Sequence, residues 1–251
     1  MVSESGVIRI DARGLHYREL NARLREVAAN GAQKIELCNV YGQRYIGTDL
    51  DRPVEIEIFG TPGNDLGAFM DGPRIIVRGN AQDGCGNTMN SGEIIIHGHA
   101  GDIAGFSMRG GRIFVKENVG YRVGIHMKEY GEKRPLLVIG GTAQDFLGEY
   151  MAGGILIVLG LTLKPGEGHR AQFIGTGMHG GAIYLRGTAE KYQLGKEVGV
   201  SDLEESDREL LRSAVEDFCT YFGGAPQEIL EASFSKLVPL WLRPYGRLYA
   251  Y

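Results

Sequence analysis

Residues 145–160 read DFLGEYMAGGILIVLG, and residues 173–187 repeat the same plan as FIGTGMHGGAIYLRG. In both stretches a glycine is followed three residues later by methionine, then by a Gly-Gly pair and a short apolar run. Short runs of this kind, rich in branched residues and bounded by glycine, are typical of buried β-strands. The repetition predicts a chain built from similar coils.

The same glycine recurs along most of the chain, with a spacing of 19 residues between Gly67 and Gly124. Three residues after each copy lies a methionine, or Leu50 in the first copy, and the residue before each copy is apolar. Glycine suits a corner because it adopts positive φ without steric cost and lets neighbouring backbone approach closely. The seven structural repeat glycines are Gly47, Gly67, Gly86, Gly105, Gly124, Gly148 and Gly175.

Eight and ten residues after the glycine, most copies place a pair of branched apolar residues such as Ile75 and Val77. Small insertions shift the pair to Ile56 and Ile58 in one coil and to Leu136 and Val138 in another. TPR, ankyrin and armadillo repeats are excluded because their longer units contain helices, and the asparagine ladder of leucine-rich repeats is missing. The pattern predicts an all-β solenoid, a single-stranded right-handed parallel β-helix of about seven turns with the apolar pairs inside.

The segments at both ends of the predicted solenoid lack the glycine repeat. Leu15, Leu20, Leu24, Val27 and Ala28 follow helical spacing before the strand KIELCNV, which predicts an α/β cap over residues 1–40. The β-helix domain is expected over residues 41–187. The glycine repeat stops after residue 187. Residues 188–251 are expected to form a separate helical appendage with a helix from Ser201 and Asp202 toward Gly223.

A row of large apolar residues lies between the inward pairs and is therefore expected on the outer face of the sheet. An exposed apolar row of this size marks a covered surface. Either the C-terminal helix of the chain or a partner subunit is expected to lie on it. The candidate interface ladder consists of Ile76, Ile95, Phe114, Leu137, Ile157 and Tyr184.

Composition bounds the function more than it defines it. A formal net charge of −4 gives no reason to expect a nucleic acid or an anionic membrane as partner. The N-terminus lacks the pattern of a secretory signal, and no stretch is long and apolar enough to span a membrane, so a cytoplasmic location is expected. Three scattered cysteines, Cys38, Cys85 and Cys219, suit neither a disulfide framework nor a metal-ligand set.

Catalytic patterns are not evident in the sequence. The histidines show no HExxH spacing, and His97 and His99 flank a corner glycine with the basic residues Arg78 and Lys116 one coil away. Asp83, Asp102 and Asp145 recur three residues before the repeat glycine, where aspartate commonly bonds to turn backbone. No catalytic, cofactor-binding or metal-binding residue is therefore assigned, and no catalytic site of the chain's own is expected.

The repeated G-x-x-M-x-G-G and the corner glycines resemble the GXGXG domain at the C-terminal end of the glutamate synthase large subunit. The resemblance covers residues 40–187, and FSKLVPL at residues 234–240 resembles the segment that follows that domain. It implies a stand-alone, non-catalytic structural subunit of a split glutamate synthase, acting in glutamate biosynthesis and ammonia assimilation. The expected partners are a glutamine amidotransferase subunit and an FMN-dependent synthase subunit, which would hold the FMN and the iron–sulfur clusters.

Two alternatives stay open at this point. The solenoid subunit of formylmethanofuran dehydrogenase shares the glycine-methionine repeat and is also understood as a scaffold. A saccharide-acting β-helix enzyme is the alternative of another class, and it would use stacked carboxylates such as Asp83 and Asp102.

Overall fold

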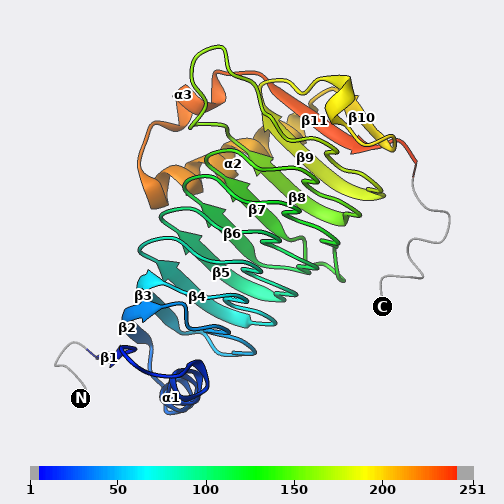
Figure 1. Ribbon diagram of the computed structural model, residues 1–251. Helices are drawn as coiled ribbons and strands as arrows, with labels where there is room; N and C mark the ends of the chain where they lie inside the picture. The colour runs from blue at the N-terminus through cyan, green and yellow to red at the C-terminus, as the bar shows by residue number, and fades with distance from the viewer. Residues whose placement is uncertain (1–5, 242–251) are drawn as a thin grey trace.

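Successive coils of the chain pair strand on strand into one long sheet (Figure 1). In the computed structural model, which describes residues 6–241, eleven strands follow the order β1-β2-β3-β4-β5-β6-β7-β8-β9-β11-β10. Pairing is parallel from β1 to β9 and antiparallel at β11 and β10. The strands are β1 (Val7–Asp11), β2 (Lys34–Tyr41), β3 (Glu55–Thr61), β4 (Asp71–Val77), β5 (Ser91–Ile96), β6 (Arg112–Val115), β7 (Leu136–Ile139), β8 (Ala152–Val158), β9 (Gly180–Arg186), β10 (Val198–Ser201) and β11 (Phe234–Pro239).

The core is a stack of identical contacts repeated from coil to coil. Residues 19 positions apart stand side by side in neighbouring strands, for example Ile75 beside Ile94 and Ile94 beside Ile113. Their side chains point inward with the methionines of the repeat, and all of them are fully buried. The chain is therefore a predominantly β solenoid, as the spacing predicts.

The repeat glycines bring the turns of the coil directly onto the inner face of the sheet. All seven have φ between 66° and 74°, the left-handed region that favours glycine. A Cβ atom on Gly67 would lie 2.8 Å from Cδ1 of Ile94, and one on Gly105 would lie 2.7 Å from Cδ1 of Leu137. Glycine is thus required at these positions for two reasons: its φ is positive, and the strand residue that faces it leaves no space for a Cβ atom.

The solenoid makes about six turns rather than the seven that the number of glycines suggests. The first coil departs from the repeat, because paired residues of β2 and β3 such as Lys34 and Glu55 are 21 positions apart, whereas Glu55 and Arg74 of β3 and β4 are 19 apart. Regular coils therefore begin at β3.

The predicted phase of β7 is wrong by one residue. Leu137 pairs with Ile113 and is fully buried inside the solenoid, whereas Val138 pairs with Phe114 on the outer face. Leu137 is therefore not a member of the outer ladder, and Leu136 and Val138 do not point inward. The cause is the insertion at residues 128–135, which breaks the count from the glycine. A slip of one residue in a strand exchanges its two faces.

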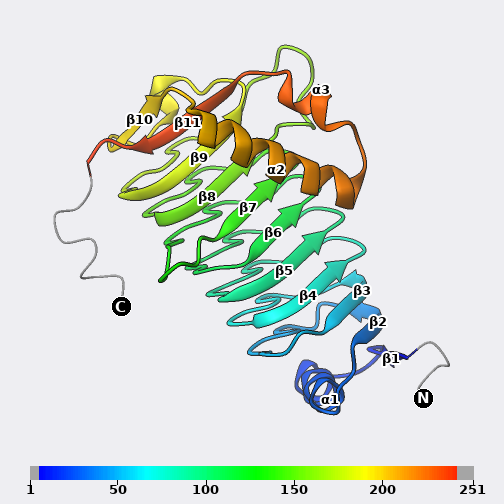
Figure 2. The ribbon, with the colours of Figure 1, turned by 180° about the vertical axis from the view of Figure 1, so that it is seen from behind.

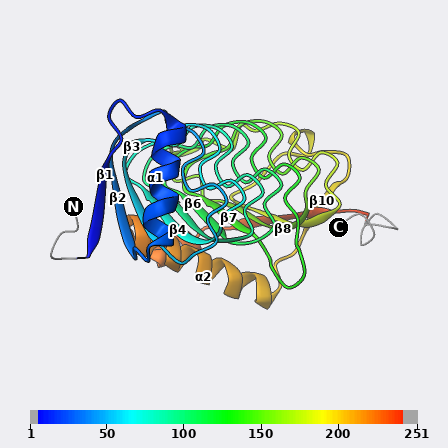
Figure 3. The same cartoon turned by 90° about the horizontal axis from the view of Figure 1, so that it is seen from below.

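At the N-terminal end, helix α1 (Tyr17–Ala29) connects β1 to β2 and lies across the opening of the solenoid (Figure 3). Its residues Leu20, Leu24 and Ala28 are buried in the same cluster as the inward residues of the first coils. The helix lies where the spacing of Leu15 to Ala28 places one.

At the C-terminal end, the segment after β9 is not a separate helical appendage. FSKLVP forms β11, which pairs antiparallel with β9, and β10 pairs with β11, because the edge of β9 would otherwise stay unpaired. The segment also contains a 3₁₀ turn (Lys191–Gln193), helix α2 (Glu205–Phe222) and helix α3 (Pro226–Leu230). The N-cap of helix α2 is Glu204, which forms a capping box with Asp207, and not Ser201 or Asp202; the C-cap is Gly223, as expected.

We predict that Gly86→Val destabilises the protein in two separable ways. Positive φ costs a branched residue about 1–2 kcal/mol, and the added side chain would overlap Ile113, a clash that costs about 1–3 kcal/mol more. Gly42→Val is the matched control, since Gly42 has φ 77° but no atom within 4 Å of an added Cβ. Urea unfolding of both variants measures the difference, and equal losses would show that the contact with Ile113 is unimportant.

Candidate functional site

The outer face of the sheet changes character along the solenoid. One column of paired residues is acidic at Glu36 and Glu57, then continues as an apolar row through β4 to β9. Of the predicted ladder, Ile76, Ile95, Phe114, Ile157 and Tyr184 lie in this column, with Val138 in the place given to Leu137. All of these outer residues are buried. Another part of the chain therefore covers this apolar row on the outer face of the sheet.

Helix α2 is the cover over much of this face (Figure 2). Its buried apolar residues form one cluster with Phe114, Val138, Ile157 and Tyr184 of the sheet. The buried residues of α2 are Asp207, Leu211, Ala214, Val215, Phe218 and Cys219. The ladder from β6 to β9 is thus closed by the chain's own helix, and it is not a free surface for a partner subunit.

A buried polar group fixes the start of α2 to the last strands. Asp207 accepts hydrogen bonds from the hydroxyl of Tyr184 on β9 at 2.7 Å and from the backbone N–H of Glu204 at 2.8 Å. Its other neighbour is the ammonium of Lys236 on β11, also at 2.7 Å. Burial opposes ionisation of Asp207, but these donors outweigh it and lower the pKa of the carboxyl. Burial and the bond to Asp207 raise the pKa of Tyr184.

The end of α2 is held by a second polar contact, four strands away. The hydroxyl of Tyr221 donates to Glu93 on β5 at 2.8 Å, and burial together with this bond raises the pKa of Tyr221 to about 12. Asp217 of the same helix pairs with Arg112 on β6. The helix is therefore fixed at both ends by groups on different coils.

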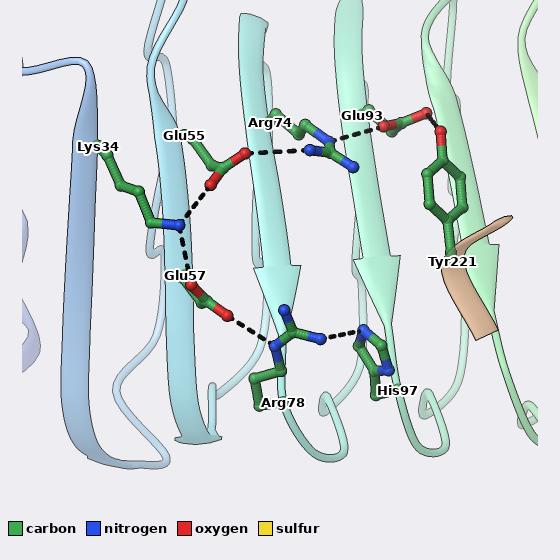
Figure 4. A network of polar contacts seen from close by, with 8 residues as sticks. All are labelled: Lys34, Glu55, Glu57, Arg74, Arg78, Glu93, His97 and Tyr221. Carbon is green, nitrogen blue, oxygen red and sulfur yellow. Dashed lines mark hydrogen bonds and ion pairs between the residues drawn. The ribbon is translucent and has the colours of Figure 1, made fainter. Parts of the chain in front are cut away.

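Beyond Tyr221 the outer face is open and charged, and its side chains form the network in Figure 4. Lys34, Glu55, Arg74, Glu93 and Arg112 stand in one column of five neighbouring strands, with alternating charge. Neighbouring groups form ion pairs at 2.9 Å for Lys34–Glu55 and 3.0 Å for both Arg74–Glu55 and Arg74–Glu93. Opposite charges side by side stabilise the parallel register.

A second line of this network runs through Glu57. Arg78 lies 2.7 Å from Glu57 and 2.8 Å from Nε2 of His97, and Lys34 lies 3.2 Å from Glu57. Burial opposes ionisation of Glu57, but Arg78 and Lys34 outweigh it and lower its pKa. Burial and the positive charges of Arg78 and Lys116 lower the pKa of His97. The network surrounds a hollow of about 310 Å³. Its three carboxylates and two arginines are all engaged with one another, so it is suited to holding coils in register rather than to proton transfer.

The recurrent aspartates bond to backbone at the corners, as predicted. Oδ1 of Asp83 accepts the N–H of Asp102, and Oδ1 of Asp102 accepts the N–H of Tyr121, each at 2.9 Å. Oδ1 of Asp145 accepts the N–H of Gln172 at 2.8 Å. Each side chain therefore ties one coil to the next.

Among residues 6–241, no group of three or more metal-ligating side chains is placed to hold an ion. His99 donates from Nε2 to Glu117 at 2.7 Å, and its Nδ1 accepts the N–H of Asn118 in the next coil. Cys85 is fully buried, which raises the pKa of its thiol to about 12. In the same described range, no helix is long and apolar enough to cross a bilayer.

Sequence reasoning missed the side of the solenoid opposite the sheet, which we call the turn face. It carries the residues two before and two after each repeat glycine, and all of them have positive φ. Bulky residues in this region cost about 1–2 kcal/mol each. Only their fixed distance from the repeat glycine relates these residues to one another in the sequence, because they share no residue type. The row before the glycines is Tyr45, Asp65, Gly84, Ile103, Arg122, Phe146 and Phe173, and the row after them is Asp49, Phe69, Thr88, Ser107, His126, Tyr150 and Gly177.

Comparisons with known proteins agree with the repeat and the fold. The sequence model of the GXGXG motif family matches residues 19–243. An uncharacterized protein of Methanocaldococcus jannaschii is 52% identical over 248 residues, which are 96% of this chain and 95% of that protein. A chain of the formyltransferase/hydrolase complex of Methylorubrum extorquens, solved with methylofuran, has a similar fold with a TM-score of 0.64 at 20% identity. That likeness covers 94% of this chain and 92% of the other.

We predict that Asp207→Asn lowers the free energy of unfolding by about 3 kcal/mol, because it leaves the partly buried ammonium of Lys236 without its counter-charge. Asp217→Asn breaks the half-exposed pair with Arg112 and should cost less than about 1 kcal/mol. Chemical denaturation of both variants checks the contrast.

The pH dependence follows from the lowered pKa of Asp207. Its stabilisation is present above its ordinary value of 3.8 and is lost as the pH falls through the lower folded value. The difference between the wild type and Asp207→Asn should therefore shrink below that pH. A difference that stays constant down to acid unfolding would contradict the role of the carboxylate charge.

Proposed function

The chain belongs to the GXGXG motif family, the family of the glutamate synthase C-terminal domain, and from this premise we propose that it is the non-catalytic structural subunit of a split glutamate synthase. In this role it braces a glutamine amidotransferase subunit against an FMN-dependent synthase subunit. The FMN and the iron–sulfur clusters belong to those partners. The complex acts in glutamate biosynthesis in the cytoplasm.

The observation that carries the proposal is the family match across residues 19–243, which spans the solenoid together with α2 and β11. The polar groups described above support a scaffold, because they hold coils and helices together. Asp83, Asp102 and Asp145, the carboxylates that a saccharide-acting enzyme would use, bond to corner backbone instead. We also assign a right-handed winding to the solenoid, because a crossover between parallel strands of one sheet is right-handed in nearly all proteins.

The proposed bracing surface differs from the one that the apolar ladder suggested. Helix α2 occupies the ladder, so the outer sheet face from β6 to β9 is not the surface that contacts the amidotransferase or the synthase. A partner has to bind elsewhere on the solenoid.

A second candidate is a scaffold like the solenoid subunit of formylmethanofuran dehydrogenase. The observation that favours it is the fold likeness to a chain of the formyltransferase/hydrolase complex over 94% of this chain. At 20% identity this likeness concerns the fold alone. Both candidates place the chain in a complex with catalytic subunits.

We predict that the tagged chain, purified from its native cytoplasm, retains an amidotransferase and a flavin-containing synthase subunit. Mass spectrometry identifies the retained subunits, and an assay with glutamine and 2-oxoglutarate measures glutamate formation. Reconstitution without this chain should lose glutamine-dependent synthesis. Retention of molybdenum or tungsten enzyme subunits would instead support the second candidate, and undiminished activity of the two partners alone would reject the bracing role.

A further inference from the structure

We propose that the turn face is the docking surface for a partner subunit that offers an apolar patch with lysine or arginine at its border. This inference deepens the proposed function and rests on it. The opposite side of the solenoid carries α2 and the charged network, as Figures 2 and 4 show. The turn face carries aromatic side chains that are exposed to solvent.

The aromatic residues of the turn face occupy backbone positions that aromatic residues rarely adopt. Phe69, Tyr150 and Phe173 have φ of 58°, 52° and 58°, yet they expose 49%, 42% and 52% of their surface. Asparagine or glycine would adopt this backbone with less strain. About half of each ring stays exposed in the chain itself, and burial against a second protein would offset the backbone strain.

Two of these rings, Phe173 and Tyr150, stack on a neighbouring ring, which favours their use as anchors. Phe146 and Phe173 stack at 4.9 Å with an interplanar angle of 13°, and the guanidinium of Arg122 lies 4.6 Å from the centre of the Phe146 ring. Arg122 is fixed in turn by its ion pair with the buried Glu149.

A second pair lies in the other row of the turn face. His126 and Tyr150 stack at 5.4 Å and 11°, and the Tyr150 ring lies over Gly177, where any side chain would collide with it. Aromatic and arginine side chains that are already ordered lose little entropy on binding, and such residues dominate the affinity of protein interfaces.

Charge defines the border that the partner needs. Asp83 and Asp102 stand in the row beside the aromatic positions and are exposed, while each holds a backbone N–H of the next coil through Oδ1. Asp49 adds a third exposed carboxylate in the row after the glycines. A partner with a basic border would meet these carboxylates, whereas a second copy would bring like charges toward one another. We therefore assign the surface to a partner subunit and not to self-association.

The test is the double variant Tyr150→Asn/Phe173→Asn, measured for binding to purified amidotransferase and synthase subunits of the same organism. Because asparagine tolerates the positive φ, the melting temperature should stay the same or rise, while affinity for a partner subunit falls by about 30-fold or more. Tyr192→Asn is the matched control, since Tyr192 is 74% exposed but lies outside both rows, and it should leave binding unchanged.

A second variant tests the charge of the border. Asp83→Asn/Asp102→Asn retains an acceptor oxygen for the backbone N–H and removes only the negative charges. It should keep the melting temperature and slow association several-fold at low salt, with the difference vanishing at high salt.

The outcomes separate this inference from the proposed function. Failure of the wild type to bind either subunit rejects the split glutamate synthase. Wild-type binding that the aromatic double variant retains rejects the turn face alone. A wild-type dimer in sedimentation that the double variant abolishes would assign the surface to a second copy and overturn the proposed occupant.

Discussion

The contact between a repeat glycine and a strand residue of the next coil determines the architecture of this protein. It brings the turns within van der Waals distance of the sheet, so the core is a single layer of interdigitated branched side chains and methionines. A thin core leaves little tolerance for volume, because packed interiors relax only partly around an added group. The residues two positions before and after each glycine also have positive φ, and the aromatic residues of the turn face are among them.

Cohesion along the solenoid comes from groups that act between coils rather than within them. Backbone ladders, the inward rows, the corner aspartates and the column of alternating charges each join one coil to the next. Helix α2 extends this further, because its polar anchors reach from β9 at Asp207 to β5 at Tyr221. Stability is therefore a property of the stack, as expected for repeat proteins in which each unit contacts its neighbours.

The sequence was sufficient for the repeat and its inward residues, because both follow from a period that nothing disturbs between Gly67 and Gly124. It was insufficient where the period breaks. The insertion before β7 removed the count that assigned Leu137, and only pairing with Ile113 settles its face. The apolar ladder and the amphipathic α2 were each visible, but their contact joins segments far apart in the chain. The strand character of FSKLVP depends on the free edge of β9, a tertiary feature. The rows of the turn face share no residue type, so composition does not reveal them.

The reversal of chain direction at β11 has a consequence for length. Each regular coil advances the solenoid by about 4.8 Å, the distance between neighbouring strands. Since β11 runs against β9, the sheet offers no parallel template on which a further coil of the same kind could be added at that end. The number of coils in the sequence therefore fixes the length of the solenoid, and this length can change only by whole coils. Insertion or deletion of one 19-residue unit between Gly67 and Gly124 would therefore lengthen or shorten the solenoid by one coil.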